Sequence, residues 1–145
     1  MKPFKLQAVL DHRQRLEDLA KQTLAEAIQK EQLLMSKMTD ETGELAEICR
    51  SYEERQSIGM QGHEFMLYEN RISHKRQLLT KLDRQLEEAR QQVRRTRQAL
   101  ADASREKKLL EKLKEKKTEE IKQELNRQEM MQIDEVAIMH RNGES

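Results

Sequence analysis

The chain has 145 residues, of which 38% are charged and only 3% are aromatic. A globular core requires more bulky apolar side chains than this, so the composition disfavours a compact globular domain and favours a long helix or coiled coil. Disorder is the competing class for so polar a chain, and the periodicity of the apolar residues decides between the two.

The first predicted helix covers about residues 4–56. Apolar or tolerated residues recur there in alternating steps of four and three, the heptad spacing of a coiled coil. The predicted seam positions are Leu24, Ile28, Glu31, Met35, Met38, Thr42, Leu45, Cys49 and Tyr52. Upstream, the same steps connect Leu6, Val9, Arg13, Leu16 and Ala20. Two successive steps of four between Leu16 and Leu24 predict a stutter, which locally unwinds a supercoil.

A turn is predicted over residues 57–62, where Gly59 and Gly62 lie three apart. Glycine is the usual residue in the left-handed conformation that ends a helix. Gly43, by contrast, is a single glycine inside a strong heptad pattern, so we expect it in mid-helix. The segment 57–62 is therefore the predicted connection between two helices.

The second predicted helix covers about residues 63–139, followed by a frayed tail over 140–145. Its seam positions are Phe65, Tyr68, Ile72, Leu79, Leu82, Leu86, Ala89, Val93, Thr96, Leu100, Ala103 and Leu110. All of these fit one register, which Lys75 and Lys107 interrupt, and a disordered chain has no reason to hold one register over six heptads. The sequence predicts an all-α fold, with residues 1–145 forming a single long antiparallel two-helix coiled-coil hairpin.

The second helix is expected to overhang the first. With a turn centred near residue 60, position i of the first helix faces position 119 − i of the second, so the first helix is exhausted near residue 115. Residues 116–139 then project ~35 Å beyond their partner. Apolar residues continue along this segment at Ile121, Leu125, Met131 and Ile138. An uncovered apolar face usually marks an interaction site, and Met130, Met131 and Met139 suit an adaptable one.

The net charge of +1 is unevenly distributed. Residues 11–64 hold 7 basic and 12 acidic side chains, and residues 84–117 hold 12 basic and 6 acidic ones. Segments of opposite sign suggest that the two helices pair with each other. The basic run lacks the interleaved aromatic residues that stack on bases, so nucleic acid is not an expected partner.

The sequence contains no recognisable catalytic, cofactor or metal site. Its histidines, His12, His63, His74 and His140, lack the paired spacing of a zinc site. Phosphate-binding and nucleophile motifs are absent, and a two-helix rod has no enclosed pocket. We therefore expect no enzyme and no cofactor. Cys49 is the single cysteine, which favours a reducing compartment. We also expect no signal peptide and no membrane-inserted segment, and hence a cytoplasmic protein.

Three segments together resemble the flagellar FliJ family, the stalk and chaperone-escort component of the flagellar type III export apparatus. They are FKLQAVLDHRQRLEDLA at residues 4–20, REKKLLEKLKEKK at 105–117, and MMQIDEVAIMHR at 130–141. The resemblance covers nearly the whole chain. It implies a stalk that inserts its paired termini into the hexameric export ATPase, reaches the cytoplasmic part of the membrane export gate with its hairpin end, and handles substrate-specific export chaperones. It also implies peripheral association with the cytoplasmic face of the inner membrane.

The resemblance, together with the overhang, assigns candidate residues to two surfaces. The ATPase-binding candidates are Leu6, Leu10, Arg13, Leu110, Glu111, Lys112, Leu113, Ile121, Leu125, Met131, Asp134, Glu135 and Ile138. The candidates for contact with the export gate or chaperones are Tyr52, Phe65 and Tyr68 near the hairpin tip. Three alternatives stay open: an injectisome counterpart, a purely structural coiled coil without an ATPase partner, and a nucleic-acid-binding coiled-coil arm.

Overall fold

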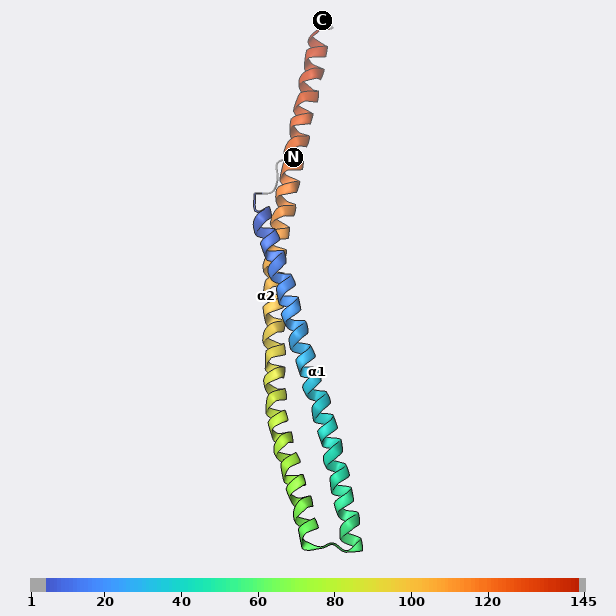
Figure 1. Cartoon of the computed structure of the whole chain (residues 1–145). Coiled ribbons are helices and arrows are strands. Elements are labelled where there is room, and N and C mark those ends of the chain that lie inside the picture. The colour runs from blue at the N-terminus through green and yellow to red at the C-terminus, as the bar shows by residue number, and fades with distance from the viewer. Residues whose placement is uncertain (1–4, 144–145) are drawn as a thin grey trace. The chain divides into compact units, whose positions relative to one another are not determined.

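The computed structural model describes residues 5–143, which form two helices and no strand. Helix α1 spans Gln7–Ile58 (52 residues) and helix α2 spans Gly62–Gly143 (82 residues; Figure 1). The predicted all-α class is confirmed. The chain divides into two compact units. The turn unit is Leu19–Ala101, and the terminal unit comprises the described residues up to Asp18 and from Asp102 onward.

The helix bounds differ from the predicted ones by a few residues. Helix α1 ends at Ile58 instead of residue 56, and its expected start at residue 4 lies outside the described residues. Residues 140–143 belong to α2 and are not a frayed tail, because no glycine or proline interrupts the helix before Gly143. Residues 144 and 145 lie outside the described part of the chain. The assignment of residues 1–145 to a single domain stays a prediction.

The turn is shorter than predicted and uses one glycine. Residues 59–61 are the only non-helical residues between α1 and α2. Gly59 has a φ of 113°, in the region that favours glycine. Its N–H donates to the Arg55 carbonyl at 3.0 Å, which closes the last turn of α1. Gly62 already begins α2 and has no positive φ.

The seam of α2 follows the predicted register. In the turn unit its buried members are Ile72, Leu82, Leu86, Ala89, Val93 and Thr96. Leu82 and Leu86 pack against Leu34 of α1, and Ile72 packs with Ile48 and Tyr52. Phe65 is the exception, because its side chain is 45% exposed at the first turn of α2.

The register predicted for α1 was wrong at every second position. Ala27, Leu34, Glu41 and Ile48 face α2, where the prediction had Ile28, Met35, Thr42 and Cys49. Met35, for example, is 43% exposed while the neighbouring Leu34 is buried. The error arose because adjacent residues are both apolar at three of the four sites, so that the pattern of α1 alone does not distinguish the seam residue from its neighbour.

The predicted stutter in α1 is also wrong. Leu10 and Glu17 are buried in the terminal unit, while Leu6 and Val9 are exposed. With Glu17 counted as a seam residue, steps of three and four alternate from Leu10 to Leu24 without interruption. The stutter was inferred because an acidic residue was not expected at a seam position.

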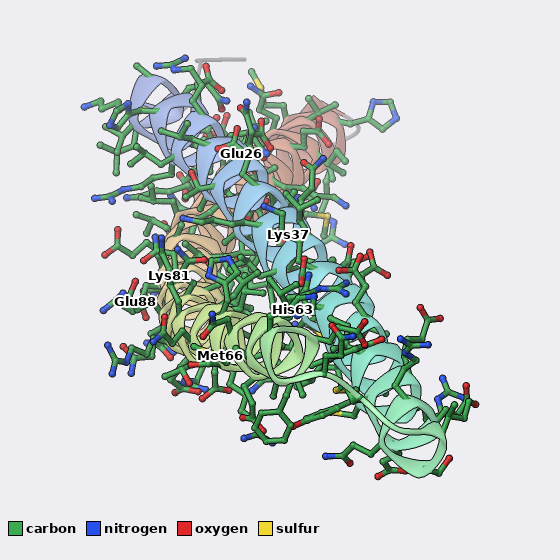
Figure 2. All side chains as sticks on the ribbon, turned by 60° about the horizontal axis from the view of Figure 1, so that its bottom comes forward. Glu26, Lys37, His63, Met66, Lys81 and Glu88 are labelled. Atoms are coloured by element: carbon green, nitrogen blue, oxygen red, sulfur yellow. The ribbon has the colours of Figure 1, made fainter. Side chains whose placement is uncertain are left out.

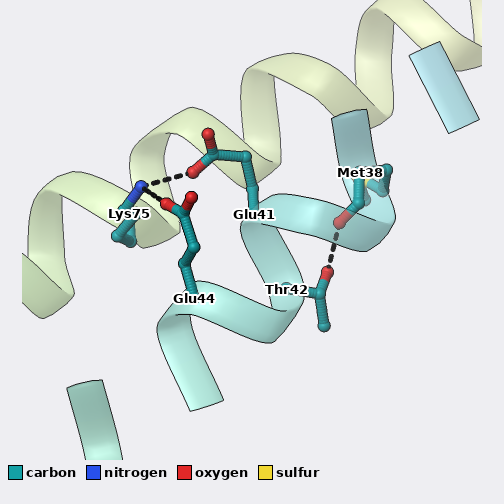
Figure 3. Close-up of polar contacts among 5 residues, drawn as sticks. All are labelled: Met38, Glu41, Thr42, Glu44 and Lys75. Atoms are coloured by element: carbon teal, nitrogen blue, oxygen red, sulfur yellow. Dashed lines mark hydrogen bonds and ion pairs between the residues drawn. The ribbon is translucent and has the colours of Figure 1, made fainter. Parts of the chain in front are cut away.

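Both lysines that interrupt the α2 register pair with seam glutamates of α1. In the turn unit, Lys75 donates to Glu41 at 2.5 Å and also to Glu44 (Figure 3). The side chains of Lys75 and Glu41 are only 20% and 24% exposed. The hydrogen bond with Glu41 and, to a smaller extent, the one with Glu44 raise the pKa of Lys75. A charged layer of this kind specifies register, since slipping the helices would leave the charges unpaired.

The second charged layer lies in the terminal unit. Lys107 donates to Glu17 at 3.3 Å and lies 3.5 Å from Glu111 in its own helix. The Glu17 side chain is 8% exposed and that of Lys107 is 19% exposed. Burial lowers the pKa of Lys107, but its hydrogen bonds and the charges of Glu17 and Glu111 together outweigh burial and raise it.

The contacts within each unit follow the expected pairing of position i with position 119 − i. Arg13 bonds Glu106 in the terminal unit, and in the turn unit Ser51 bonds Tyr68 and Arg55 bonds Glu64. Every residue from 115 to 143 is exposed, in agreement with an α1 that ends its contribution near residue 115. In the terminal unit, α2 continues past the beginning of α1 (Figure 1). We call residues 115–143 the overhang.

We expected the acidic side chains of α1 to balance the basic side chains of α2. Along part of the turn unit this balance is absent. Residues 84–100 hold five basic and two acidic side chains. Residues 19–35, which face them, hold two of each sign. The acidic excess of α1 lies nearer the turn, so this stretch of α2 keeps an unbalanced positive charge.

We expect Leu86→Ala to destabilise the protein by ~2–4 kcal/mol, because it leaves a cavity in the seam. Leu86 is 5% exposed, whereas Leu109, in the same helix, is 62% exposed and supplies the matched control Leu109→Ala. Urea denaturation followed by circular dichroism measures both variants. Equal losses of stability would contradict the assigned seam.

We expect stability to fall on the alkaline side of the ordinary lysine pKa of about 10.4. The pKa of Lys75 is raised in the folded state. The stabilisation that the charged Lys75 contributes is therefore complete below the ordinary lysine pKa, and it is lost as the pH rises through the raised pKa of the folded state. Lys75→Met should destabilise the protein at neutral pH, because Glu41 and Glu44 lose their cation. The variant should also lose less stability between neutral and alkaline pH than the unsubstituted chain.

Urea midpoints at neutral and alkaline pH test this expectation. Lys81→Met is the matched control, because Lys81 is exposed on α2 and makes no ion pair among the described residues. An alkaline loss as large in Lys75→Met as in the unsubstituted chain would show that this layer does not contribute.

Candidate partner-binding surfaces

The overhang exposes all of its apolar residues. The predicted contact residues Ile121, Leu125, Met131 and Ile138 are 45%, 52%, 53% and 59% exposed. Asp134 and Glu135 are exposed as well. In heptad terms Ile121, Leu125, Met131 and Ile138 occupy positions a, e, d and d, so they share one broad face of the helix.

The overhang also exposes apolar residues that the sequence analysis did not assign to the surface. They are Ile133 and Val136, which are 61% and 66% exposed. Met130 and Met139, expected as adaptable contacts, are 60% and 73% exposed. Ile133 and Val136 were missed because only residues close to the extended seam register were considered. The density of apolar residues from Met130 to Met139, whatever their register, is the signal that would have found them.

A local ion pair supports the helix within the overhang. Arg127 donates to Glu124 through two nitrogens, at 2.7 and 3.1 Å, and its Nη1 lies 3.9 Å from the Met131 sulfur. The hydrogen bond from Arg127 lowers the pKa of Glu124, although partial desolvation opposes the change. Spacing of three residues along a helix suits such a pair. The helix therefore has its own polar support where α1 no longer covers it.

The remaining ATPase-binding candidates lie where α1 and α2 pair in the terminal unit. Leu10 is buried at 8% exposure, and Leu110 and Leu113 are half-buried. Arg13 bonds Glu106, and Glu111 lies beside Lys107. Leu6 is 38% exposed and Lys112 is also exposed. Of this set, Leu6 and Lys112 are exposed, the side chains of Arg13 and Glu111 are 38% and 44% exposed, and the leucines of the seam hold the helices together.

The three aromatic candidates near the turn meet in one cluster. Tyr52 is 8% exposed and stacks on Tyr68, with ring centroids 5.1 Å apart and planes 4° apart. Phe65 approaches Tyr52 edge-on at 5.6 Å and 73°. The Tyr52 hydroxyl donates to Glu69 at 2.9 Å. Burial, followed by this bond and the charge of Glu69, raises the pKa of Tyr52. Tyr52 is therefore internal and supports the more exposed Phe65.

Around this cluster the turn presents an apolar surface that the sequence analysis did not identify. Ile58, Met66 and Leu67 are 78%, 64% and 59% exposed. Figure 2 shows Met66 and His63 at the turn end of α2. We call Ile58, Phe65, Met66 and Leu67 the tip surface. The last two lie outside the seam register, which is why periodicity alone did not single them out.

Residues 5–143 lack both a cluster of metal-binding side chains and a membrane-spanning helix. They contain no group of three or more His, Cys, Asp or Glu side chains that could hold a metal ion. Neither of their helices has a stretch long and apolar enough to cross a bilayer.

Comparison with known proteins decides the family. The sequence profile of the Flagellar FliJ protein family matches residues 1–144. The chain belongs to the flagellar FliJ family. This confirms the resemblance drawn from the termini and the 105–117 segment, and it assigns the chain to the type III export proteins. Among curated protein sequences, none matches the chain.

A solved structure shows the same fold. It is described as that of a YscO homolog, CT670, from Chlamydia trachomatis. The similarity covers 97% of this chain and 96% of that one, with a TM-score of 0.72 and 18% sequence identity. This supports the helical hairpin that the heptad pattern predicted.

We expect Tyr52→Ala to destabilise the protein near the lower end of the ~3–5 kcal/mol typical of losing a buried aromatic side chain. Met66→Ala, at an exposed position of the same region, should change stability by no more than ~0.5 kcal/mol. Thermal and urea denaturation of the two variants measure the contrast. A Tyr52→Ala variant as stable as Met66→Ala would show that the aromatic cluster does not hold the turn region together.

Proposed function

We propose that this FliJ-family protein is a stalk of the flagellar type III export apparatus that binds the hexameric export ATPase through its overhang. The observation that carries the proposal is that every residue from 115 to 143 is exposed although the segment has an apolar face. An uncovered apolar helix face of this kind suits docking in a groove or central opening of a partner. The family provides the identity of that partner.

Within the proposed contact, different residues have different tasks. Ile121, Leu125, Met131 and Ile138 supply the apolar area. Asp134 and Glu135 orient the overhang against basic groups of the ATPase, and exposed charges of this type affect the association rate more than the final affinity. Leu6, Arg13 and Lys112, at the paired ends of the helices, border the contact, while Leu10 and Leu110 hold those ends together.

The turn region has a different proposed partner, the cytoplasmic part of the membrane export gate. The tip surface supports this assignment, because its four exposed apolar residues lie in the helix ends next to the turn, and one of them, Phe65, packs edge-on against Tyr52. Handling of export chaperones is proposed for the same region. The protein would then be cytoplasmic and held at the inner membrane through the export apparatus, coupling the ATPase to the gate. No cofactor takes part in this function.

Removal of residues 121–145 tests the ATPase contact. We expect the truncated protein to keep its thermal midpoint, because α1 does not cover the removed residues, and to lose binding to the export ATPase and any stimulation of ATP hydrolysis. Asp134→Lys with Glu135→Lys, in the full chain, should slow association with little change in the dissociation rate.

The control for the truncation is Ile58→Ser with Met66→Ser, which changes exposed apolar residues at the tip instead. This variant should stimulate the ATPase as well as the unsubstituted chain. A folded truncation that still stimulates hydrolysis fully would contradict the proposal. A truncation that unfolds would show that the overhang contributes to the hairpin after all.

A further inference from the structure

An open groove runs along one side of the seam in the turn unit. Its floor is formed by the buried residues Ala27, Leu34 and Ala89. Because two of the three are alanines, the helices leave a volume of about 460 Å³ between them. The walls are formed by Lys30, Gln85, Glu88, Gln92 and Arg95. An open groove with a small-residue floor admits apolar side chains from an incoming helix.

The rim of this groove is apolar in part and carries positive charge. Leu33 is 62% exposed next to the floor residue Leu34. Lys30 makes no ion pair among the described residues, and Arg95 bonds only the neighbouring Gln92. Exposed Lys37 and Lys81 lie on the surface of the same unit (Figure 2). The groove therefore lies in the part of the turn unit where basic side chains outnumber acidic ones.

The overhang has the complementary chemistry. Residues 118–143 hold six acidic and three basic side chains. The heptad register places Glu120 and Glu129 at positions g and b, which border the face of Ile121, Leu125 and Met131 on its two sides. Lys122 and Arg127 occupy the same two kinds of position, and Arg127 pairs with Glu124 of its own helix. The overhang thus combines an apolar stripe with an overall negative excess, and the groove combines an apolar floor with the cations Lys30 and Arg95 beside the carboxylate of Glu88.

We infer that the groove of one molecule receives the overhang of a second copy of this chain. Two overhangs would repel each other, because both carry a negative excess, whereas overhang and groove attract. The dimensions agree: Gln85 to Arg95 along the groove and Ile121 to Met131 along the stripe each span ~15 Å. Met131 adapts to an irregular floor because its side chain is flexible and polarizable.

This contact is distinct from the ATPase contact and does not depend on it. The two contacts have different partners but use the same face of Ile121, Leu125 and Met131. A molecule whose overhang lies in another molecule's groove therefore has no free overhang for the ATPase. Self-association would thereby keep an apolar helix face covered while no other partner is bound.

Charge exchange in the full-length chain tests the inference. The groove variant carries Lys30→Glu and Arg95→Glu, and the overhang variant carries Glu120→Lys and Glu129→Lys. Sedimentation equilibrium should show concentration-dependent association of the unsubstituted 17.3 kDa chain, weakening as salt is added. Each variant alone should associate at least about tenfold more weakly, because like charges then face each other. An equimolar mixture of the two should associate again, since the reversed groove matches the reversed overhang.

The matched control is Arg84→Glu with Arg90→Glu, which changes the net charge equally but lies outside the residues that line the groove. It should associate like the unsubstituted chain. Circular dichroism establishes that each variant is folded, as expected for exposed positions. Zero-length crosslinking of isotope-labelled with unlabelled chains should join Lys30 to Glu120 or Glu129 between molecules. An unsubstituted chain that stays monomeric, variants that associate normally, or a mixture that fails to recover would each overturn the inference.

Discussion

The thin two-stranded seam is the constraint on which the other features of this protein depend. A residue in such a seam is covered by one partner helix and by its own neighbours, and none of the described side chains is completely removed from solvent. Stability must therefore accumulate along many partly buried layers, such as the separate clusters around Leu86 and Tyr52. The same geometry lets Lys75 and Lys107 occupy seam positions, since their ammonium groups reach both a partner carboxylate and the surface. Wherever the partner helix ends, the seam residues of the other helix become surface.

The heptad pattern of α2 predicted its seam almost completely, because the buried seam residues in the middle of that helix have polar neighbours in sequence. Leu82, Leu86 and Val93 have no apolar competitor beside them. Helix α1 differs: Leu34 precedes Met35 and Ile48 precedes Cys49, so two registers bury similar apolar area in a single-sequence reading. The shape and charge of α2 determine which of the two adjacent residues faces the seam. The pattern of α1 alone therefore does not determine its register.

The polar residues of the seam were harder to foresee than the apolar ones. Glu17 and Glu41 read as solvent-facing residues until their lysine partners are identified, and the partners lie 90 and 34 residues away in sequence. The extent of the overhang followed from helix length and pairing alone. Its full apolar surface did not, because Ile133 and Val136 lie off the seam register of α2. At the turn, likewise, the three aromatic residues were singled out, while their mutual packing and the exposed Ile58, Met66 and Leu67 were not foreseen.

The end of α1 also separates two kinds of selection along α2. Before residue 115, a substitution at a seam position first affects the packing between α1 and α2. A poor fit there destabilises the fold, whatever a partner protein requires. Beyond residue 115 no contact within the hairpin limits the choice of side chain, apart from the need to stay helical. The overhang is therefore free of the packing constraint of the hairpin, whereas a substitution at a seam position in the paired part of α2 has to fit against α1.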